Sequence, residues 1–434
     1  MKRTTRLPPA LAALLLAWTV ASGYAATNER TATVITHYRT GMEAAKDEDW
    51  KSYAEHMLAI LELEPGHPAI ERHLARAYAR QGRREDALTW LERAVNTGAD
   101  FDLAEDEHFV DLRLDERFTR ILARVAELKQ PLGAASEAFR ISTRPLLPEG
   151  IAFDPVDDVF YLGSIHQRKI LRIQRDGNYD DFTGAAADGM LGVLGLRVVP
   201  ERRELWAVTA GIAGMKGLTS AIEGASSVHR YSLEDGRLIK AYRASNEDEK
   251  HNFNDLVVAA DGRAYITDAL SGALYTIDPT SDTLEILHGP GTFSSPNGLA
   301  LSHDGSRLYI AQYGIGIALM ETGSLEADIL PHPDTVTPVG IDGLYYYKGS
   351  LIAVQNFLGM QQVTRFELSA DGAAIAASGV LERQHPSFED PTTAAIAGGY
   401  LYVVANSQLP RLGEGGSVPA PGQFDDSVIL RIRL

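Results

Sequence analysis

The sequence of 434 residues contains no cysteine. Disulfide bonds, thiolate metal sites and cysteine nucleophiles are therefore excluded, and stability must come from burial and from any bound ion. Clusters of Lys and Arg are also missing, and the formal net charge is −17. Such an acidic chain argues against nucleic acid or an anionic membrane as a partner. Hydrophobic residues make up 45% of the chain, which is long enough for two or more domains.

Apolar runs long enough to span a membrane are missing as well. A shorter apolar run lies near the N-terminus. Three basic residues precede this run, which ends at small residues around Ala25 and Ala26. The pattern predicts a cleaved secretory signal over residues 1–26, and hence a periplasmic or secreted protein. A membrane anchor is the alternative, but the run is shorter than the ~20 residues that a spanning helix needs. We therefore expect no membrane span.

Residues 30–130 show helical periodicity and no strand-like alternation. Two segments align at a spacing of 34 residues, so that Gly41 corresponds to Ala75 and Tyr53 to Ala87. This spacing resembles the tetratricopeptide repeat, with Gly82 at the turn between two helices. A third unit is partial, and about three repeats are needed for a stable solenoid, so we expect the region to rest on its neighbour. A generic helical hairpin domain is the alternative.

From residue 137 onward, short alternating strands are separated by turns that contain Gly and Asp. A unit of strand, tight turn and second strand recurs six times, beginning at residues 149, 194, 254, 297, 342 and 391. A spacing of about 48 residues is typical of four-stranded propeller blades. We therefore predict a mainly β fold, in which a six-bladed β-propeller over residues 137–434 follows an N-terminal α-helical domain. Residues 137–143 are expected to complete the last blade.

Polar residues stand at the first position of most of these units. In a propeller the first strand of each blade lines the central channel, so equivalent positions converge near the axis. The six positions hold Glu149, Gly195, Asn254, Asn297, Asp342 and Thr392. Two carboxylates and two amides are oxygen ligands that suit Ca²⁺, with Mg²⁺ or another divalent cation as the alternative. Each pair such as Asn-Gly is also a common turn dipeptide, so any single one is explained by a turn, and only the four in register indicate a shared site.

The motifs LPEGIAFD, NFNDLVVAADGRAYITD, SPNGLALSHDG and GIDGLYYYKGSLIAVQ occur in this order at blade spacing. They resemble the regucalcin and gluconolactonase family of six-bladed propellers, also called senescence-marker-protein/gluconolactonase/LRE-like. The resemblance implies metal ligation by Glu149, Asn297 and Asp342. It also implies that Asp342 is the catalytic base and that Asn254 lies beside metal and substrate. Family lactonases have an Arg two residues before this Asn, whereas this chain has Asn252, so specificity for a sugar acid lactone is not carried over.

These observations predict an exported, calcium-dependent hydrolase of a small-molecule lactone or ester. Asp342 would take a proton from a water on the ion. His251 is a candidate proton shuttle and His166 a second, although the pattern favours an ordinary surface or loop histidine for each. The alternative is a non-catalytic module, in which the ion braces the channel and the helical repeats and propeller bind a protein or glycan.

Further polar residues lie where they could reach a ligand at the rim of the channel. Asn252 precedes the third unit, and the others end second strands of the last two blades. The predicted substrate-binding residues are Asn252, Gln355, Asn356 and Asn406. Buried amides that hold the loops between blades are the equal alternative. The glycine-rich segment GIAGMKGLTSAIEGASS is expected either to cover the mouth or to be a disordered insertion.

Overall fold

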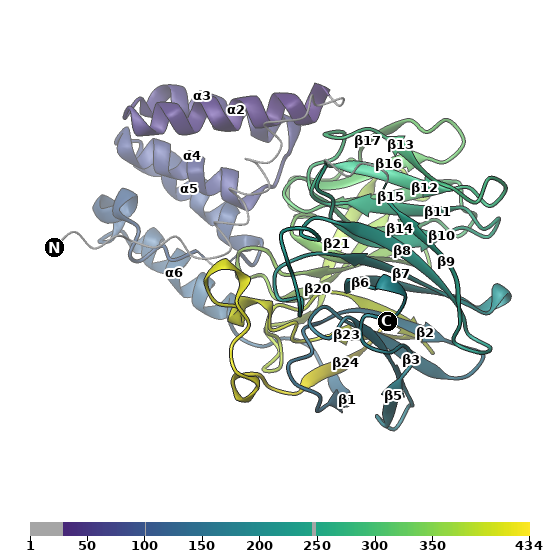
Figure 1. Ribbon diagram of the computed structural model, residues 1–434. Helices are drawn as coiled ribbons and strands as arrows, with labels where there is room; N and C mark the ends of the chain where they lie inside the picture. Colours follow the sequence, from purple (N-terminus) through teal and green to yellow (C-terminus); the bar gives the residue numbers. More distant parts are fainter. Residues whose placement is uncertain (1–28, 100, 245–248) are drawn as a thin grey trace.

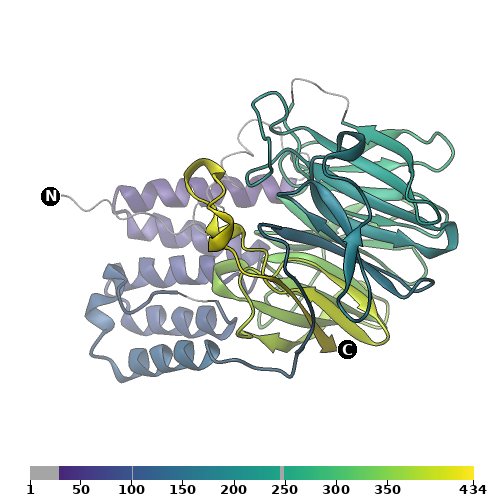
Figure 2. The ribbon, with the colours of Figure 1, turned by 60° about the horizontal axis from the view of Figure 1, so that its bottom comes forward.

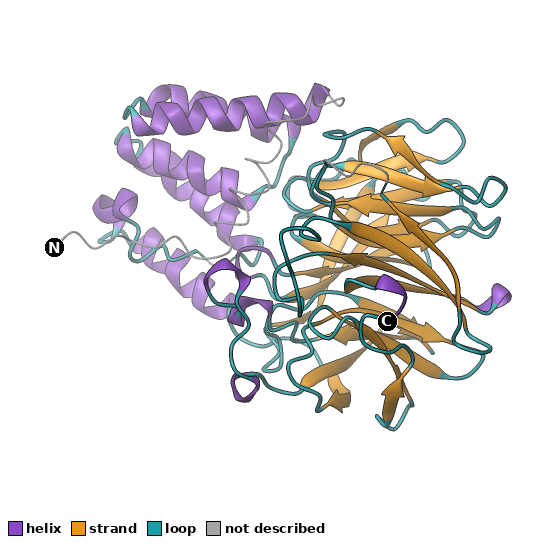
Figure 3. Cartoon of the chain, in the orientation of Figure 1, coloured by secondary structure: helices purple, strands orange, loops and turns teal. Residues whose placement is uncertain are grey.

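The computed structural model describes residues 29–99, 101–244 and 249–434, so the predicted signal over residues 1–26 lies outside the described residues. Helices gather on one side of the molecule and strands on the other (Figures 1 and 3). The strands form six four-stranded sheets. The prediction of a mainly β, six-bladed propeller with an N-terminal helical region is confirmed. No helix in the described part of the chain is long and apolar enough to cross a membrane.

The helical half is built of antiparallel pairs. Its elements are α2 (Glu29–Lys46), α3 (Trp50–Leu63), α4 (Pro68–Arg80), α5 (Arg84–Asn96), the 3₁₀ helix η2 (Glu107–Leu112) and α6 (Glu116–Leu128). Gly82 has a φ of +73° at the turn between α4 and α5, a conformation that glycine adopts without strain. A Cβ at Gly41 would lie 2.7 Å from the methyl group of Met57, so a small residue is needed where α2 meets α3. The small residues of the 34-residue spacing therefore mark close helix contacts.

The first three blades follow in chain order. Blade one holds β2 (Pro148–Asp154), β3 (Val159–Ser164), β4 (Lys169–Ile173) and β5 (Tyr179–Asp181). Blade two holds β6 (Gly192–Val199), β7 (Glu204–Ala210), β8 (Ser226–Ser232) and β9 (Leu238–Arg243). Blade three holds β10 (Phe253–Val258), β11 (Ala264–Asp268), β12 (Ala273–Ile277) and β13 (Leu284–His288). Each blade is a meander, because neighbouring strands in the sheet are also consecutive in sequence.

The next two blades repeat this order, and the last one does not. Blade four holds β14 (Pro296–Leu301), β15 (Arg307–Gln312), β16 (Gly316–Glu321) and β17 (Ala327–Ile329). Blade five holds β18 (Ile341–Tyr347), β19 (Ser350–Gln355), β20 (Gln362–Leu368) and β21 (Ile375–Arg383). Blade six holds β22 (Ala394–Ala397), β23 (Tyr400–Val404), β24 (Ser427–Arg433) and, as its fourth strand, β1 (Ser136–Ile141). Strand β1 pairs antiparallel with β24, which confirms that residues just after the helices complete the last blade.

Burial explains why the strands form where they do. Strand β3 is buried along its whole length, because both faces pack against neighbouring blades. The fourth strand of a blade lies at the outer edge, and β13 is correspondingly half-buried or exposed throughout. The inner strands β2, β6, β10, β14 and β18 contact one another in sequence, and β2 also contacts β22. Blades five and six share a buried cluster, which closes the ring and brings the first positions of the six units together.

The helical half rests on the propeller through a shared hydrophobic core. Val339, Phe357, Leu358 and Met360 of the propeller belong to the same buried cluster as the residues between the helices. Ion pairs border this contact, including Arg93 with Asp334 at 3.0 Å. The segment of residues 405–426, between β23 and β24, lies at the border of helices and blades (Figure 2). The expectation that the partial repeats rest on their neighbour agrees with this packing.

Candidate metal centre

A β-bulge interrupts the innermost strand pair of five blades at the same register. In blade one the pairing shifts between Pro148 and Ile151, and in blade four it shifts between Pro296 and Leu299. The equivalent shifts in blades two, three and five lie in β6, β10 and β18. Each bulge contains two residues. In blades one, three, four and five the first of the two is a predicted metal ligand: Glu149, Asn254, Asn297 and Asp342, respectively. The backbone therefore presents these side chains from equivalent positions.

The bulges correct one sequence alignment. In blade two the shift lies between Val193 and Leu196, so the residue equivalent to Glu149 is Leu194. The sequence-based prediction placed Gly195 there, because Gly195 was aligned with the first residue of each unit. Gly195 instead corresponds to Gly150, the second residue of the first bulge. Leu194 is buried, so blade two offers no polar side chain at this position.

The second residue of a bulge meets the backbone of the next blade. A Cβ at Gly298 would lie 2.5 Å from the Leu344 nitrogen and 2.6 Å from the Asp342 carbonyl oxygen. Gly150 would likewise collide with the carbonyl oxygen of Leu194. Glycine is required because backbone atoms cannot give way as a flexible side chain can. The repeated X-Gly dipeptide therefore lies at a bulge inside the inner strand and not in a turn, and contact between blades explains its glycine.

Three of the predicted ligands carry a buried oxygen with no hydrogen-bond partner. Within the described part of the chain, Glu149 Oε2, Asn254 Oδ1 and Asn297 Oδ1 are all buried and unpaired. Buried polar atoms are nearly always hydrogen-bonded, since an unpaired one costs about 1–3 kcal/mol. Three such oxygens at equivalent positions of the inner strands β2, β10 and β14 fit a hard cation, which would accept their lone pairs.

Asp342 differs from these three because its carboxylate has protein partners. Asn356 Nδ2 donates to Asp342 Oδ2 at 2.8 Å, and the Asn297 side chain also hydrogen-bonds this carboxylate. Burial and then repulsion by Asp390 raise the pKa of Asp342 to about 7. Burial and the nearby Asp342 carboxylate also raise the pKa of Glu149 well above its usual range. Two carboxylates that resist ionisation together are stabilised when a cation lies between them.

The side chains that could bind a cation here are of two kinds, carboxylates and amides. No group of three or more His, Asp or Glu side chains in the described residues is arranged to hold a metal ion. A cation at this position would therefore depend on the amide oxygens of Asn254 and Asn297 in addition to the carboxylates. All four donors are oxygen atoms, which favours Ca²⁺ or Mg²⁺ over zinc or copper.

Asp390 is a further acidic residue of the site that was not predicted from the sequence. It lies just before β22 with a φ of +59°, and Ser407 Oγ donates to its Oδ2 at 2.8 Å. Burial raises its pKa to about 6, and its charge acts on both Glu149 and Asp342. The available signal was its position, two residues before Thr392 in the sixth unit. No repeated motif marks it, because blade six has no bulge like those of the other blades among its described pairings.

His251 and Asn252 lie together above blade three. The His251 Nδ1 proton is donated to Asp268 Oδ2 at 2.7 Å, and the Asn252 backbone N–H donates to Asp268 Oδ1 at 2.9 Å. Burial opposes ionisation of Asp268, but hydrogen bonds from His251, Asn252 and Ser271 lower its pKa below the usual value. His251 Nε2 and Asn252 Oδ1 are buried and have no partner in the described residues. The roles predicted for both residues stay predictions.

The other predicted substrate-binding amides are occupied by protein contacts. Gln355 Nε2 donates to the carbonyl oxygens of Thr337 and Val339 at 3.0 and 2.7 Å. Asn406 donates to the Asp426 carbonyl oxygen at 2.9 Å and accepts from the Val428 N–H at 2.7 Å. These contacts agree with the loop-holding alternative, and the substrate-binding role of both amides stays a prediction. Asn356, by contrast, contacts the predicted base directly.

The glycine-rich segment between β7 and β8 packs against neighbouring residues of the propeller. His166 Nδ1 donates to the Gly214 carbonyl oxygen at 2.7 Å, so this histidine holds the loop between β7 and β8. Met215 of this loop is buried in a cluster that also contains Leu147, two residues before Glu149. Leu412, from the segment between β23 and β24, packs against the same cluster. Two loops thus meet at the border of the candidate metal centre.

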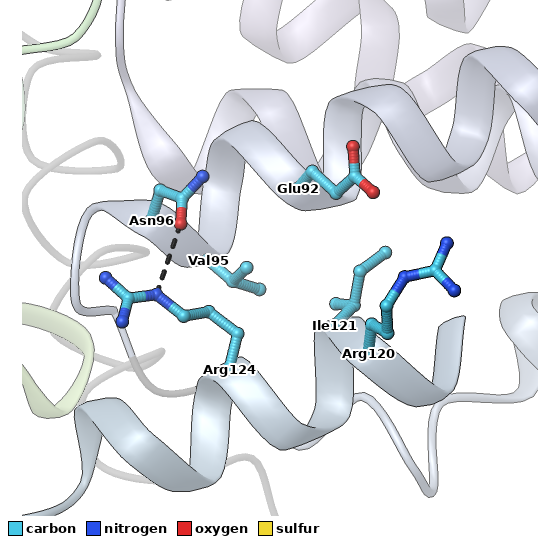
Figure 4. Close-up of a pocket in the computed structure, with 6 residues that line it drawn as sticks. All are labelled: Glu92, Val95, Asn96, Arg120, Ile121 and Arg124. Carbon is cyan, nitrogen blue, oxygen red and sulfur yellow. Dashed lines mark hydrogen bonds between the residues drawn. The ribbon is translucent and has the colours of Figure 1, made fainter. Parts of the chain in front are cut away.

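A separate pocket lies in the helical half, between α5 and α6 (Figure 4). It has a volume of about 170 Å³ and is lined by Glu92, Val95, Asn96, Arg120, Ile121 and Arg124. Arg124 Nε donates to Asn96 Oδ1 at 3.3 Å across it. The pocket combines two cations with an acidic and an amide group, and it contains none of the predicted site residues.

Two family models match parts of the chain. Residues 147–313 match the SMP-30/Gluconolactonase/LRE-like region, and residues 51–106 match the tetratricopeptide repeat. Both resemblances inferred from the motifs are thereby confirmed. The first match includes Glu149, Asn254 and Asn297, whereas Asp342 lies beyond it. Among curated protein sequences, none matches this chain.

Similar folds occur among solved structures. A gluconolactonase from Xanthomonas campestris is 18% identical, with a TM-score of 0.46 over 70% of this chain and 99% of its own. The PQQ-bound aldose sugar dehydrogenase from Streptomyces coelicolor is 16% identical, with a TM-score of 0.48 and coverages of 70% and 99%. Regucalcin from Agrobacterium tumefaciens, a calcium-binding protein, is 17% identical, with a TM-score of 0.48 and coverages of 68% and 95%.

Proposed function

We propose, on the premise that residues 147–313 form a SMP-30/gluconolactonase/LRE-like region, that the protein is an exported, calcium-dependent hydrolase of lactones or carboxylic esters. The observation that carries the proposal is the set of buried, unpartnered oxygens of Glu149, Asn254 and Asn297 in the described residues. They lie on equivalent bulges next to a fourth oxygen ligand, Asp342. This arrangement is costly in an empty protein and favourable around a dication.

Charge and geometry favour calcium among the hard cations. The carboxylates of Glu149 and Asp342 balance the two positive charges of one ion. Ligands that come from four separate strands form an irregular set, which calcium tolerates and magnesium does not. When bound, such an ion polarises a carbonyl group and lowers the pKa of a coordinated water.

The residues around the ion have distinct proposed roles. Asp342 receives a proton at its carboxylate, whose orientation is fixed by the hydrogen bond from Asn356 to Oδ2. His251 relays a proton through Nε2, the nitrogen that has no partner in the described residues, while Asp268 holds its other nitrogen. Asn252 binds substrate through its unpartnered Oδ1. Neither side chain replaces the positive charge of an arginine, so we expect a substrate without a carboxylate at that point.

A panel of lactones and esters, assayed with calcium and with chelator, tests the proposal. We expect hydrolysis by the calcium-loaded protein, loss of activity with chelator, and a fall of at least about 10²-fold in kcat for Asp342→Asn. Asp304→Asn is the matched control, because Asp304 is an exposed turn residue with contacts to Ser302 and Ser306. Absence of hydrolysis across the panel, with calcium bound, would overturn the catalytic role.

The second candidate function is recognition of a protein or glycan, with the ion as a structural brace. The pocket between α5 and α6 favours it, because it offers both charges and an amide within the segment that matches the tetratricopeptide repeat and the helix that follows (Figure 4). Capture of a cell-envelope partner that Arg120→Glu abolishes, together with no turnover of any substrate, would favour this role over hydrolysis.

A further inference from the structure

A continuous series of contacts joins the helical half to the predicted catalytic base. It begins at His67, the residue before α4, and ends at the carboxylate of Asp342. Between them lie Phe357, Tyr313 and Asn356, which come from the loops that follow β15 and β19. The helices therefore contact the same face of the propeller that carries the candidate metal centre.

Asn356 is held in one orientation by its partners. Tyr313 donates its hydroxyl proton to Asn356 Oδ1 at 2.7 Å. The amide nitrogen donates on its other side to Asp342 Oδ2 at 2.8 Å and to the Pro391 carbonyl oxygen at 3.1 Å. Burial, followed by the charge of Asp342, raises the pKa of Tyr313 well above its usual range, so the phenol keeps its proton. A donor at Oδ1 forces the amide N–H groups toward Asp342.

Tyr313 is itself held by the helical half. Phe357 lies between the rings of Tyr313 and His67, in edge contacts with centroid distances of 5.7 and 6.3 Å. His67 Nε2 lies 2.8 Å from the carbonyl oxygen of Gly314, the next residue along the chain from Tyr313. Burial lowers the pKa of His67 to about 4, so the ring is neutral and donates this hydrogen bond through Nε2. The position of Tyr313 is therefore set from both sides.

We propose that the helical repeats complete the metal centre: His67 positions the Tyr313–Gly314 segment, Tyr313 orients the Asn356 amide, and Asn356 orients the Asp342 carboxylate. The inference rests on the proposed function in one respect, since it takes Asp342 to be a metal ligand. It makes His67, Tyr313 and Asn356 positioning residues. It also makes the helical half part of the site and not only a surface for partners.

Calcium binding to the purified full chain tests this proposal without any assay of activity. Removing a residue that orients a metal ligand typically weakens affinity by about 10–100-fold. We expect Tyr313→Phe, which keeps the ring and its contact with Phe357, to weaken calcium binding about tenfold by titration calorimetry. Loss of the hydroxyl leaves Asn356 Oδ1 without its donor, so the amide that orients the Asp342 carboxylate is held less firmly. His67→Ala should weaken binding in the same direction, and His67→Gln, which keeps a donor, should restore most of it.

Matched controls separate positioning from general stability. Tyr309→Phe removes a hydroxyl on β15, the strand that precedes Tyr313, and the partner of this hydroxyl is the Gly372 carbonyl oxygen, at 2.9 Å, on the outer part of the propeller. Arg117→Ala removes ion pairs to Glu85 and Glu92 within the helical half. Both controls should bind calcium within about twofold of the wild type. Thermal unfolding without metal shows whether each variant is folded.

The outcomes are distinct. If Tyr313→Phe and His67→Gln are folded and Tyr313→Phe binds calcium as tightly as wild type, the positioning role is overturned, and the proposed hydrolase is unaffected. Wild-type protein that binds calcium but hydrolyses nothing overturns the hydrolase, while the expected loss in Tyr313→Phe still supports positioning. Wild-type protein that binds no calcium overturns both. If His67→Ala does not fold, Tyr313→Phe alone decides the question.

Discussion

At the scale of single residues, the buried carboxylates of Glu149 and Asp342 dominate the energetics of the candidate site. Each is less than a tenth exposed, at 3% and 9%. Two negative charges in so little solvent are unfavourable unless a proton or a cation compensates them. The metal-free protein is expected to use protons for this purpose, and the calcium-bound protein to release them.

This exchange predicts how stability depends on pH. In the metal-free protein Asp342 has a pKa of about 7, against 3.8 for an ordinary aspartate. Below about pH 4 the folded and unfolded states both hold the proton. Between about pH 4 and 7 only the folded state holds it, so the free energy of unfolding falls as pH rises, by about 4 kcal/mol. Calcium stabilisation should correspondingly grow from pH 5 to pH 8, as measured by chemical denaturation with chelator and with calcium.

The double variant Glu149→Gln/Asp342→Asn is the control for this prediction. It cannot ionise at either position, so its metal-free stability should exceed that of the wild type at pH 8, and calcium should no longer raise its melting temperature. A wild-type melting shift that persists in the double variant would contradict the proposed ion site.

At the scale of elements, the repeated bulge and its glycine hold neighbouring inner strands together. Blade three shows what replaces the glycine: Asp255 takes that position, and its carboxylate accepts hydrogen bonds from the Leu256 and Leu299 N–H groups at 2.8 and 3.3 Å. Arg197 lies 3.4 Å from the same carboxylate. Neighbouring blades thus meet in one of two ways at this position. Either a glycine allows backbone to contact backbone, or the Asp255 carboxylate accepts a hydrogen bond from the adjoining strand.

Gly298 offers a direct test of this contact. We expect Gly298→Ala to lower the free energy of unfolding by about 1–3 kcal/mol, because the added methyl group meets backbone atoms of β18. Gly289→Ala is the matched control, since nothing lies within 4 Å of a Cβ there and its φ is not in the left-handed region. Urea denaturation of the two variants measures the difference. Equal free energies of unfolding for the two variants would show that β14 and β18 can move apart to admit a methyl group without loss of stability.

Periodicity made these elements predictable from the sequence, and the limits of periodicity explain what was missed. The 34-residue spacing located the helix pairs, and the six recurrent units located the inner strands and three of the unpartnered oxygens. Asp390 and Tyr313 lie in loops outside the repeated motif, so their approach to Asp342 depends on loop conformation. Gln355 and Asn406 have suitable side chains in suitable places, but a sequence does not reveal that other backbone groups already occupy them.

At the scale of the whole molecule, the shared core makes the two halves one unit. Phe357 is 2% exposed, packs between the helices and the propeller, and is flanked by Val339 and Leu358 in the same cluster. Helices with only a partial third repeat gain from the propeller the burial that a longer solenoid would gain from further repeats. We therefore expect the halves to unfold together.

Calorimetry of Phe357→Ala tests this expectation. The wild type should show one thermal transition, whereas the variant, which loses about 3–5 kcal/mol of packing at the contact, should show a separate and earlier transition of the helices. Phe160→Ala is the control, because Phe160 is equally buried but lies between blades, so the protein should melt earlier in a single transition. Two transitions in the wild type would contradict the shared core.

The pairing of β1 with β24 also has a consequence in time. The Arg431 guanidinium donates to the Ser136 hydroxyl oxygen across 295 residues, so the two strands of one blade are synthesised far apart. Strand β1 is the first strand to be synthesised. Its edge stays unpaired until the five other blades and β24 have followed. The core of the helical half is likewise incomplete until Phe357 and Met360 have been synthesised. Because β1 and β24 belong to the same blade, this blade cannot be completed until the whole chain has been synthesised.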